Sequence, residues 1–180
     1  MRGALKDPSV GALARSAPIM DRVRPHLPAE PFPVRAIYFD KTASSNWLVP
    51  SYQDLTLALS HRKEVQGFGP WSVKDGMPHV QPPMAYLERM LTVRLHLDDA
   101  DEANEALRLL PGTHLMGRLD AARIRELRTS CSEVVCAVSD GDALLMKPLL
   151  PHASGRSWTQ RRRRVLHLEY ACLDLPAGLR

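Results

Sequence analysis

Alternation of polar and apolar residues marks two stretches of the sequence, Leu91-Thr-Val-Arg-Leu-His-Leu-Asp98 and Arg163-Arg-Val-Leu-His-Leu-Glu-Tyr170. Side chains two positions apart on a strand share a face, so both stretches are predicted to be strands with one polar face. Polar strand faces usually lie against solvent, which by itself favours an exposed sheet surface here.

Short β-rich segments and few helices make up the rest of the chain. Further strands are predicted at 34–39, 54–59, 134–138 and 143–146, and residues 107–110 precede a turn at Pro111-Gly112. Helices are predicted at 12–27, with a new helix beginning at Pro18, at 84–90 and at 119–127. Residues 67–83 are rich in Gly and Pro and predict a long loop beside a site. Many short strands without a βαβ order favour a mainly β sandwich or jelly roll with flanking helices.

The length of 180 residues predicts one domain over 1–180, with a helical N-terminal layer over about 1–31 and a jelly-roll core over about 32–175. Hydrophobic residues at 44% and charged residues at 24% are typical of globular proteins. The sequence contains no run of 18 apolar residues that could span a membrane. The N-terminus lacks the apolar core of a signal peptide. We therefore expect a soluble monomer or homodimer with no membrane partner.

Cysteine and charge usage narrow the setting further. The three cysteines, Cys131, Cys136 and Cys172, lack metal-type spacing and indicate reduced thiols in the cytoplasm. The net charge of +4 is modest, and Arg161 to Arg164 form the only dense basic run. Nucleic-acid binders distribute phosphate contacts over a whole face, so no nucleic-acid partner is expected.

Six motifs, in chain order, resemble one known family over about Phe32 to Tyr170. They are Asn46-Trp-Leu-Val-Pro-Ser-Tyr-Gln-Asp54, Arg94-Leu-His-Leu-Asp-Asp99, Pro111-Gly-Thr-His114, Gly141-Asp-Ala143, Pro151-His-Ala-Ser154 and Arg163-Arg-Val-Leu-His-Leu-Glu-Tyr170. Together they resemble the phytanoyl-CoA dioxygenase-like (PhyH) family of iron(II)- and 2-oxoglutarate-dependent oxygenases. The resemblance implies a double-stranded β-helix, or cupin-like jelly roll, and a small-molecule substrate.

The same resemblance implies a set of site residues. The family binds iron(II) through a His-x-Asp pair and a distant histidine, leaving open positions for 2-oxoglutarate and dioxygen. By position, the metal residues here are Tyr52, Asp54 and His152, and the catalytic residues are Asp54, His152 and Arg163. Ser154 and Arg163 match residues that hold the 2-oxoglutarate carboxylate.

Several further residues fall where the family often lines its pocket, namely Lys41, Asn46, Trp47 and Gln53. Lys41 and Asn46 are expected to bind the cofactor, although each of the four is as well explained by a structural role. A 2-oxoglutarate pocket needs a polar interior. The resemblance therefore favours burial of the polar faces of the two alternating strands, against the exposed surface that their pattern alone suggests. Arg94, His96, Arg163 and His167 should then point into the barrel.

Tyr52 stands where the family has its first metal-binding histidine. A phenol has a reference pKa near 10, so presenting its phenolate at pH 7 costs about 4 kcal/mol, whereas a neutral imidazole is already available. Metal binding should therefore be weakened. Two functions remain open: a dioxygenase that hydroxylates a small molecule, and a catalytically degenerate jelly roll that binds a small acid or partner without turnover.

Overall fold

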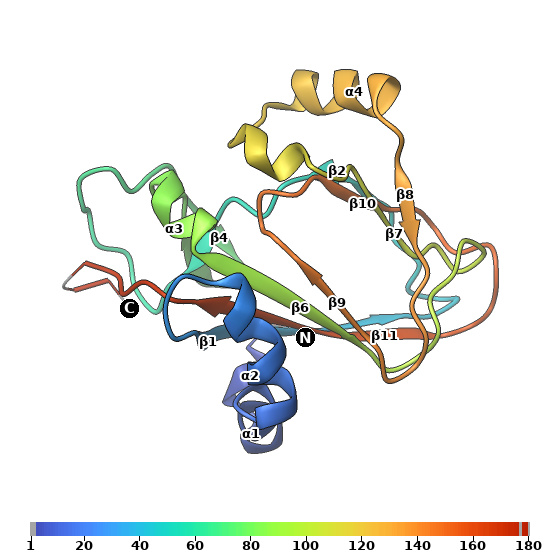
Figure 1. The fold of residues 1–180 in the computed structure, drawn as a ribbon, viewed down its shortest axis with the longest axis horizontal. Helices are drawn as coiled ribbons and strands as arrows, with labels where there is room; N and C mark the ends of the chain where they lie inside the picture. The colour runs from blue at the N-terminus through green and yellow to red at the C-terminus, as the bar shows by residue number, and fades with distance from the viewer. Residues whose placement is uncertain (1–2, 177, 180) are drawn as a thin grey trace.

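Two four-stranded antiparallel sheets form the centre of the computed structural model, which describes residues 3–176 and 178–179 (Figure 1). The first sheet has the order β1-β11-β6-β9, with β1 at Phe32–Lys41, β11 at Arg163–Ala171, β6 at Met90–His96 and β9 at Ala143–Met146. The second has the order β2-β10-β7-β8, with β2 at Val49–Tyr52, β10 at His152–Ser154, β7 at Leu107–Leu109 and β8 at Val134–Cys136. This arrangement confirms the predicted mainly β jelly roll.

Short helices flank the sheets. They are η1 at Ala4–Lys6, α1 at Pro8–Ala14, α2 at Ala17–Val23, η2 at Arg24–His26, α3 at Met84–Glu88, η3 at Thr113–Met116 and α4 at Ala121–Ser130. As predicted, Pro18 lies in the first turn of a new helix, where its missing N–H breaks no helical hydrogen bond. The helices expected near 84–90 and 119–127 are confirmed as α3 and α4.

The N-terminal helices cover one face of the first sheet (Figure 1). Apolar side chains of these helices pack against Leu91, Val93, Leu166 and Leu168 of β6 and β11. The Tyr170 hydroxyl, on the same face, donates to a helix carbonyl, Ala14 O, at 2.8 Å. Because the apolar face of the sheet is occupied by helices, the alternating polar face turns inward.

Burial of that polar face confirms the prediction made from the resemblance. The pairing of β11 with β6 sets His167 opposite Arg94, and both residues are buried together with His96 and Arg163. The interpretation of these side chains as an exposed sheet surface was wrong. Alternation reports that a strand has two different faces, and only the packing decides which of them meets solvent.

Two further predictions were wrong in part. Residues 54–59 do not form one strand, because β2 ends at Tyr52 and only Leu57–Ala58 pair again, as β3. Residues 67–83 are not all loop: β4 at Trp71–Lys74 and β5 at Met77–Val80 form a hairpin that pairs with β3. Asp75 and Gly76 have positive φ angles of 52° and 75° and make its two-residue turn. Asp-Gly is a strong hairpin signal that was missed.

Candidate active site

Three of the predicted site residues meet where β2 pairs with β10. Tyr52 lies opposite His152 in this pairing, and their ring centroids are 4.5 Å apart. Asp54 follows two residues after β2, where its backbone N–H donates to Pro148 O at 2.9 Å. This bond holds the Asp54 backbone beside the segment before β10, and Asp54 Oδ2 lies 3.7 Å from His152 Nε2.

The hydrogen bond of His152 shows which of its two ring nitrogens carries the proton. The other nitrogen presents its lone pair to Asp54. Nδ1 lies 2.9 Å from Leu150 O, which can only accept, so Nδ1 carries the proton. Burial lowers the pKa of His152 below its usual value, which favours the neutral ring. Nε2 therefore presents a lone pair. A backbone carbonyl that orients a histidine in this way is usual behind a metal-binding imidazole.

The carboxylate of Asp54 completes the pair. Burial opposes its ionisation, but positive charge around it, which with a neutral His152 includes Arg35 and Arg94, lowers the pKa of Asp54 below its usual value. Its Oδ2 is buried and has no hydrogen-bond partner among the described residues. At 3.7 Å the gap to His152 Nε2 is too long for a hydrogen bond. Two electron-pair donors thus face one point, an arrangement that fits a metal cation.

Tyr52 is a poor third donor in this setting. Burial of the hydroxyl and the negative charge of Asp54 raise the pKa of Tyr52 further above its usual value, so the side chain remains a neutral phenol. Within residues 3–176 and 178–179, no group of three His, Cys, Asp or Glu side chains could hold a metal ion. The site therefore offers two strong protein ligands and a phenol beside them.

A second group of predicted residues, Lys41, Ser154 and Arg163, meets next to this point. Lys41 Nζ donates to Ser154 Oγ at 3.1 Å and to Gly155 O at 2.7 Å, and Arg163 Nη2 donates to Ser154 Oγ at 2.8 Å. Ser154 Oγ itself donates to Glu105 O at 3.0 Å. Its lone pairs and its proton are thus all used, so in this structure Ser154 orients the two cations.

Positive charge is in excess around Ser154. Burial and the charge of Arg163 lower the pKa of Lys41 to about 8, and burial and Arg94 lower the pKa of Arg163 to about 10. Burial, Arg94 and Arg163 also lower the pKa of His96 to about 4, so His96 is neutral. These shifts share two causes: burial comes first in each, and repulsion between neighbouring cations adds to it. An anionic ligand would relieve this repulsion.

A narrow cavity of about 60 Å³ connects the two groups. It is lined by Phe39, Lys41, Trp47, Val49, Tyr52, Arg94, Leu107, His152, Ser154, Arg163 and Val165. Trp47 and Tyr52 are 36% and 39% exposed and form part of the rim. Lys41 Nζ lies 5.3 Å from the Trp47 ring centroid, which places this aromatic rim over a cation.

Asn46 and Gln53 hold the chain in the described structure. The Asn46 amide both donates to Ser157 O and accepts from Ser157 N, each at 2.8 Å. Gln53 donates to the carbonyls of Gly117 and Leu149 and accepts from the Leu119 N–H. Contact of Asn46 with the cofactor remains a prediction, since both ends of its amide are engaged with the backbone.

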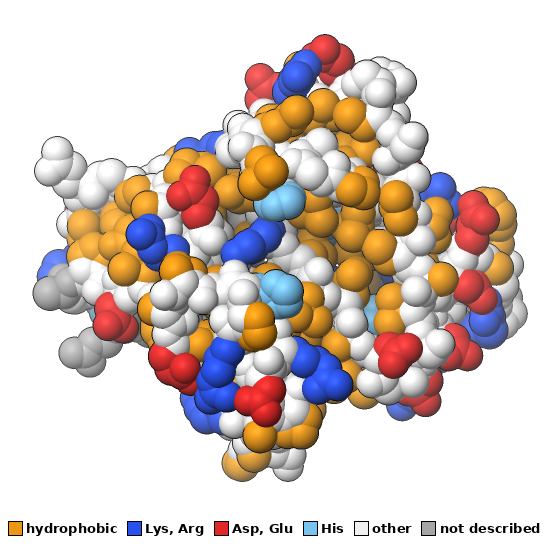
Figure 2. Space-filling view, in the orientation of Figure 1, with side chains coloured by type: hydrophobic (Ala, Val, Ile, Leu, Met, Phe, Trp, Pro, Cys, Tyr) orange, Lys and Arg blue, Asp and Glu red, His pale blue; other side chains and the backbone are white. Residues whose placement is uncertain are grey.

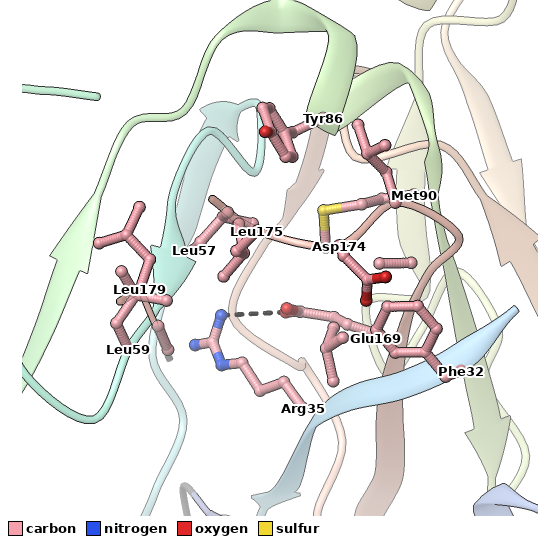
Figure 3. A pocket seen from close by; sticks show the side chains of 14 residues that line it. Phe32, Arg35, Leu57, Leu59, Tyr86, Met90, Glu169, Asp174, Leu175 and Leu179 are labelled. Atoms are coloured by element: carbon pink, nitrogen blue, oxygen red, sulfur yellow. Dashed lines mark hydrogen bonds and ion pairs between the residues drawn. The ribbon is translucent and has the colours of Figure 1, made fainter. Parts of the chain in front are cut away.

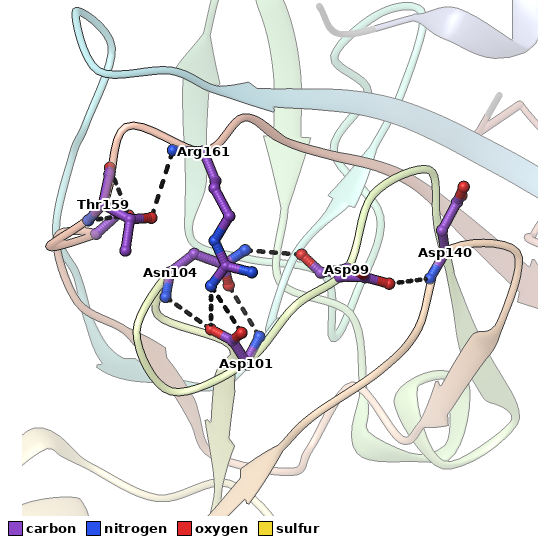
Figure 4. A network of polar contacts seen from close by, with 7 residues as sticks. Asp99, Asp101, Asn104, Asp140, Thr159 and Arg161 are labelled. Atoms are coloured by element: carbon purple, nitrogen blue, oxygen red, sulfur yellow. Dashed lines mark hydrogen bonds and ion pairs between the residues drawn. The ribbon is translucent and has the colours of Figure 1, made fainter.

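Glu105 is a site residue that the sequence reasoning missed. Its carbonyl accepts from Ser154, and its carboxylate accepts from Gly155 N at 2.9 Å, so it supports both partners of Lys41. Figure 4 shows the polar network that fixes the loop before it, in which Arg161 holds Asp101 and Asp101 bonds Asn104. The consecutive polar residues Asn104 and Glu105 gave no signal, because only the fold shows that they are buried.

The basic run at 161–164 is divided between the surface and this site. Arg161, Arg162 and Arg164 pair with Asp101, Asp40 and Asp98, each at 2.6 Å, whereas Arg163 is buried. On the face shown in Figure 2, acidic and basic side chains are interspersed. The four arginines therefore form no free basic patch. Within the described residues, no helix is long and apolar enough to cross a membrane.

Solved structures of similar fold cover most of this chain. AviO1 from Streptomyces viridochromogenes Tue57 matches 94% of this chain and 63% of its own, with a TM-score of 0.66 and 22% identity. EctD from S. alaskensis with 2-oxoglutarate and 5-hydroxyectoine matches 96% and 55%, with a TM-score of 0.72 and 20% identity. HygX from Streptomyces hygroscopicus with nickel and 2-oxoglutarate matches 94% and 69%, with a TM-score of 0.61 and 16% identity.

These likenesses show the fold. The chain spans only 34% to 63% of the length of the AviO1, EvdMO1 and nickel-bound ThoJ structures. No curated protein matches its sequence. The family model for phytanoyl-CoA dioxygenase (PhyH) matches residues 2–165, which is most of the chain. The chain therefore belongs to the phytanoyl-CoA dioxygenase (PhyH) family.

Proposed function

We propose that this protein is a non-haem iron(II)- and 2-oxoglutarate-dependent dioxygenase that hydroxylates a small molecule. The observation that carries the proposal is the convergence of Asp54 Oδ2 and His152 Nε2, 3.7 Å apart, beside a buried cluster of cations. A divalent cation fits between Asp54 Oδ2 and His152 Nε2, and a dicarboxylate fits the cluster of cations. Structural neighbours with 2-oxoglutarate or nickel bound support this assignment.

Each residue has a stated task in this proposal. Asp54 and His152 hold the metal, and Arg163 and Lys41 hold a carboxylate of 2-oxoglutarate in the orientation that Ser154 gives them. Arg163 has one side-chain hydrogen bond among the described residues, so its remaining N–H groups are available for a bidentate contact. When bound, iron(II) and 2-oxoglutarate supply oxidation by dioxygen, coupled to decarboxylation of 2-oxoglutarate.

Tyr52 is the feature that separates this chain from the family pattern. As a neutral phenol it contributes at most a weak ligand, and it lines the narrow cavity instead. A second function follows from this residue: a jelly roll that retains the anion site and binds a small acid without turnover. The two functions differ in one product, because only the dioxygenase releases succinate.

The test is binding of 2-oxoglutarate by anaerobic calorimetry, with and without iron(II). Arg163→Ala should weaken binding by about 10- to 100-fold, because it removes a buried charge-assisted contact. Arg162→Ala is the matched control, since Arg162 is an exposed neighbour paired with Asp40. Equal affinity of native protein and Arg163→Ala would refute the anion site. Succinate release in air then separates the dioxygenase from the binding protein.

A further inference from the structure

A larger cavity of about 410 Å³ lies beside Glu169 and Ala171, near the end of β11 (Figure 3). Its walls are mostly apolar and come from β1, β3, α3, β6, β11 and the segment after β11. They include Phe32, Leu57, Leu59, Tyr86, Met90, Leu175 and Leu179. A volume of this size suits a small molecule. The charged residues in the lining are Arg35, Glu169 and Asp174.

This cavity lies close to the candidate metal site. Leu57, which lines it, is three residues beyond Asp54. Arg94 lines the narrow cavity together with Tyr52 and His152, and its hydrogen bonds through His167 reach Glu169, which lines the larger cavity. The two cavities are therefore joined by one row of hydrogen-bonded side chains.

A chain of buried hydrogen bonds holds the Glu169 carboxylate in place. Arg94 Nη1 can only donate, so at 3.1 Å it gives a hydrogen bond to His167 Nδ1. The proton of His167 is then on Nε2, which donates to Glu169 Oε1 at 3.2 Å. Arg35 Nη1 donates to the same oxygen at 3.0 Å. The other oxygen, Oε2, has no hydrogen-bond partner within the part of the chain that the structure describes, and it can accept a hydrogen bond from a ligand.

The charges that line the cavity do not balance. Glu169 neutralises Arg35, whereas Asp174 is exposed and has no ion pair or hydrogen bond among the described residues. Figure 3 shows Asp174 and Glu169 in the same part of the cavity, near Phe32 and Met90. One guanidinium and two carboxylates give the lining a net charge of −1. A cationic ligand would cancel this charge, and an anionic one would add to it.

We propose that this cavity binds a small molecule with an apolar body and a protonated amine, with the amine held by Asp174 and Glu169. The apolar body packs against the leucines and Met90 of the walls. That this amine is the substrate rests on the proposed function, because only an active dioxygenase would hydroxylate it. Its binding depends on the cavity alone.

The test compares three probes of one length, n-heptylamine, n-heptanol and heptanoate, by calorimetry at pH 7 without metal or 2-oxoglutarate. n-Heptylamine should bind about tenfold more tightly than n-heptanol, and heptanoate most weakly. Asp174→Asn should weaken amine binding about three- to fivefold, since this carboxylate is partly solvated. Asp140→Asn, an exposed carboxylate outside this cavity, should leave it unchanged.

Every other pattern overturns the amine site. If heptanoate binds most tightly, Arg35 selects an anion. If the amine and the alcohol bind equally, the carboxylates of Asp174 and Glu169 contribute nothing to the affinity. The proposal is also contradicted if none of the three probes binds, or if Asp174→Asn binds the amine as tightly as native protein does. Arg163→Ala should leave amine binding intact. Amine binding without succinate release would therefore refute only the proposed function, and succinate release without amine binding would refute only this inference.

Discussion

Lys41 shows how burial and a neighbouring cation together can tune a single residue for ligand binding. Its ammonium is almost fully covered and lies beside Arg163, and both influences lower its pKa to about 8. Hydrogen bonds to Ser154 and Gly155 hold it in place without supplying a negative charge. The lysine is therefore charged at neutral pH only against a substantial electrostatic cost, which a bound carboxylate would reduce.

This pKa gives 2-oxoglutarate binding a defined pH dependence. The charged form of Lys41 binds the dicarboxylate, and that form predominates in the free protein below pH 8. Affinity should therefore be highest below about pH 8 and fall as the pH rises above it. Lys41→Arg keeps its charge and should flatten the profile between pH 7 and 9.5, measured by calorimetry. Parallel profiles for the two proteins would count against contact between Lys41 and the ligand.

At the scale of elements, the point where β2 leaves its sheet positions Asp54. Alternation at 54–59 predicted a strand, but Asp54 pairs with the turn before β10 through Pro148 O. Gln53 secures this departure, because its amide joins the backbone at Gly117, Leu119 and Leu149. Such long-range side-chain contacts to backbone leave no periodic trace in a sequence, which is why the prediction failed there.

Removing the Gln53 amide should therefore destabilise the fold. Gln53→Ala leaves one buried and two partly buried backbone groups without their partner, and we expect the free energy of unfolding to fall by about 2–4 kcal/mol. Urea denaturation followed by circular dichroism measures this loss. Gln66→Ala, at an exposed position, is the control and should be nearly neutral. A loss below 1 kcal/mol for Gln53→Ala would show that water replaces these bonds.

The sequence predicted other elements and site residues with uneven success. Regular alternation identified β6 and β11 closely, and the order of the motifs identified the residues that meet at Tyr52, Asp54 and His152. It missed Glu105 and Arg35, whose positions depend on which strands and loops become neighbours. Arg35 reaches Glu169 only because β1 pairs with β11, a contact across 134 positions of the chain.

At the scale of the whole molecule, helices on the outside make a polar interior possible. The N-terminal helices cover the apolar face of the first sheet, and the second sheet encloses its polar face. The interior then has the proposed anion site around Ser154, the candidate metal site between Asp54 and His152, and the mostly apolar cavity lined by Arg35. These three sites in one interior are the arrangement that an oxygenase with a cosubstrate requires.

Tyr52 tests this account most directly. The measurement is anaerobic iron(II) titration followed by succinate release in air, comparing native protein, Tyr52→His and Asp54→Ala. Leu115→His, which adds an imidazole at an 83% exposed position, controls for surface binding. Tyr52→His replaces a phenol that must lose a proton with an imidazole that need not, so iron(II) affinity should rise at least about tenfold, with faster succinate release. Asp54→Ala should abolish both. If native protein binds iron(II) as tightly and releases succinate as fast as Tyr52→His, the ligand set proposed here is wrong.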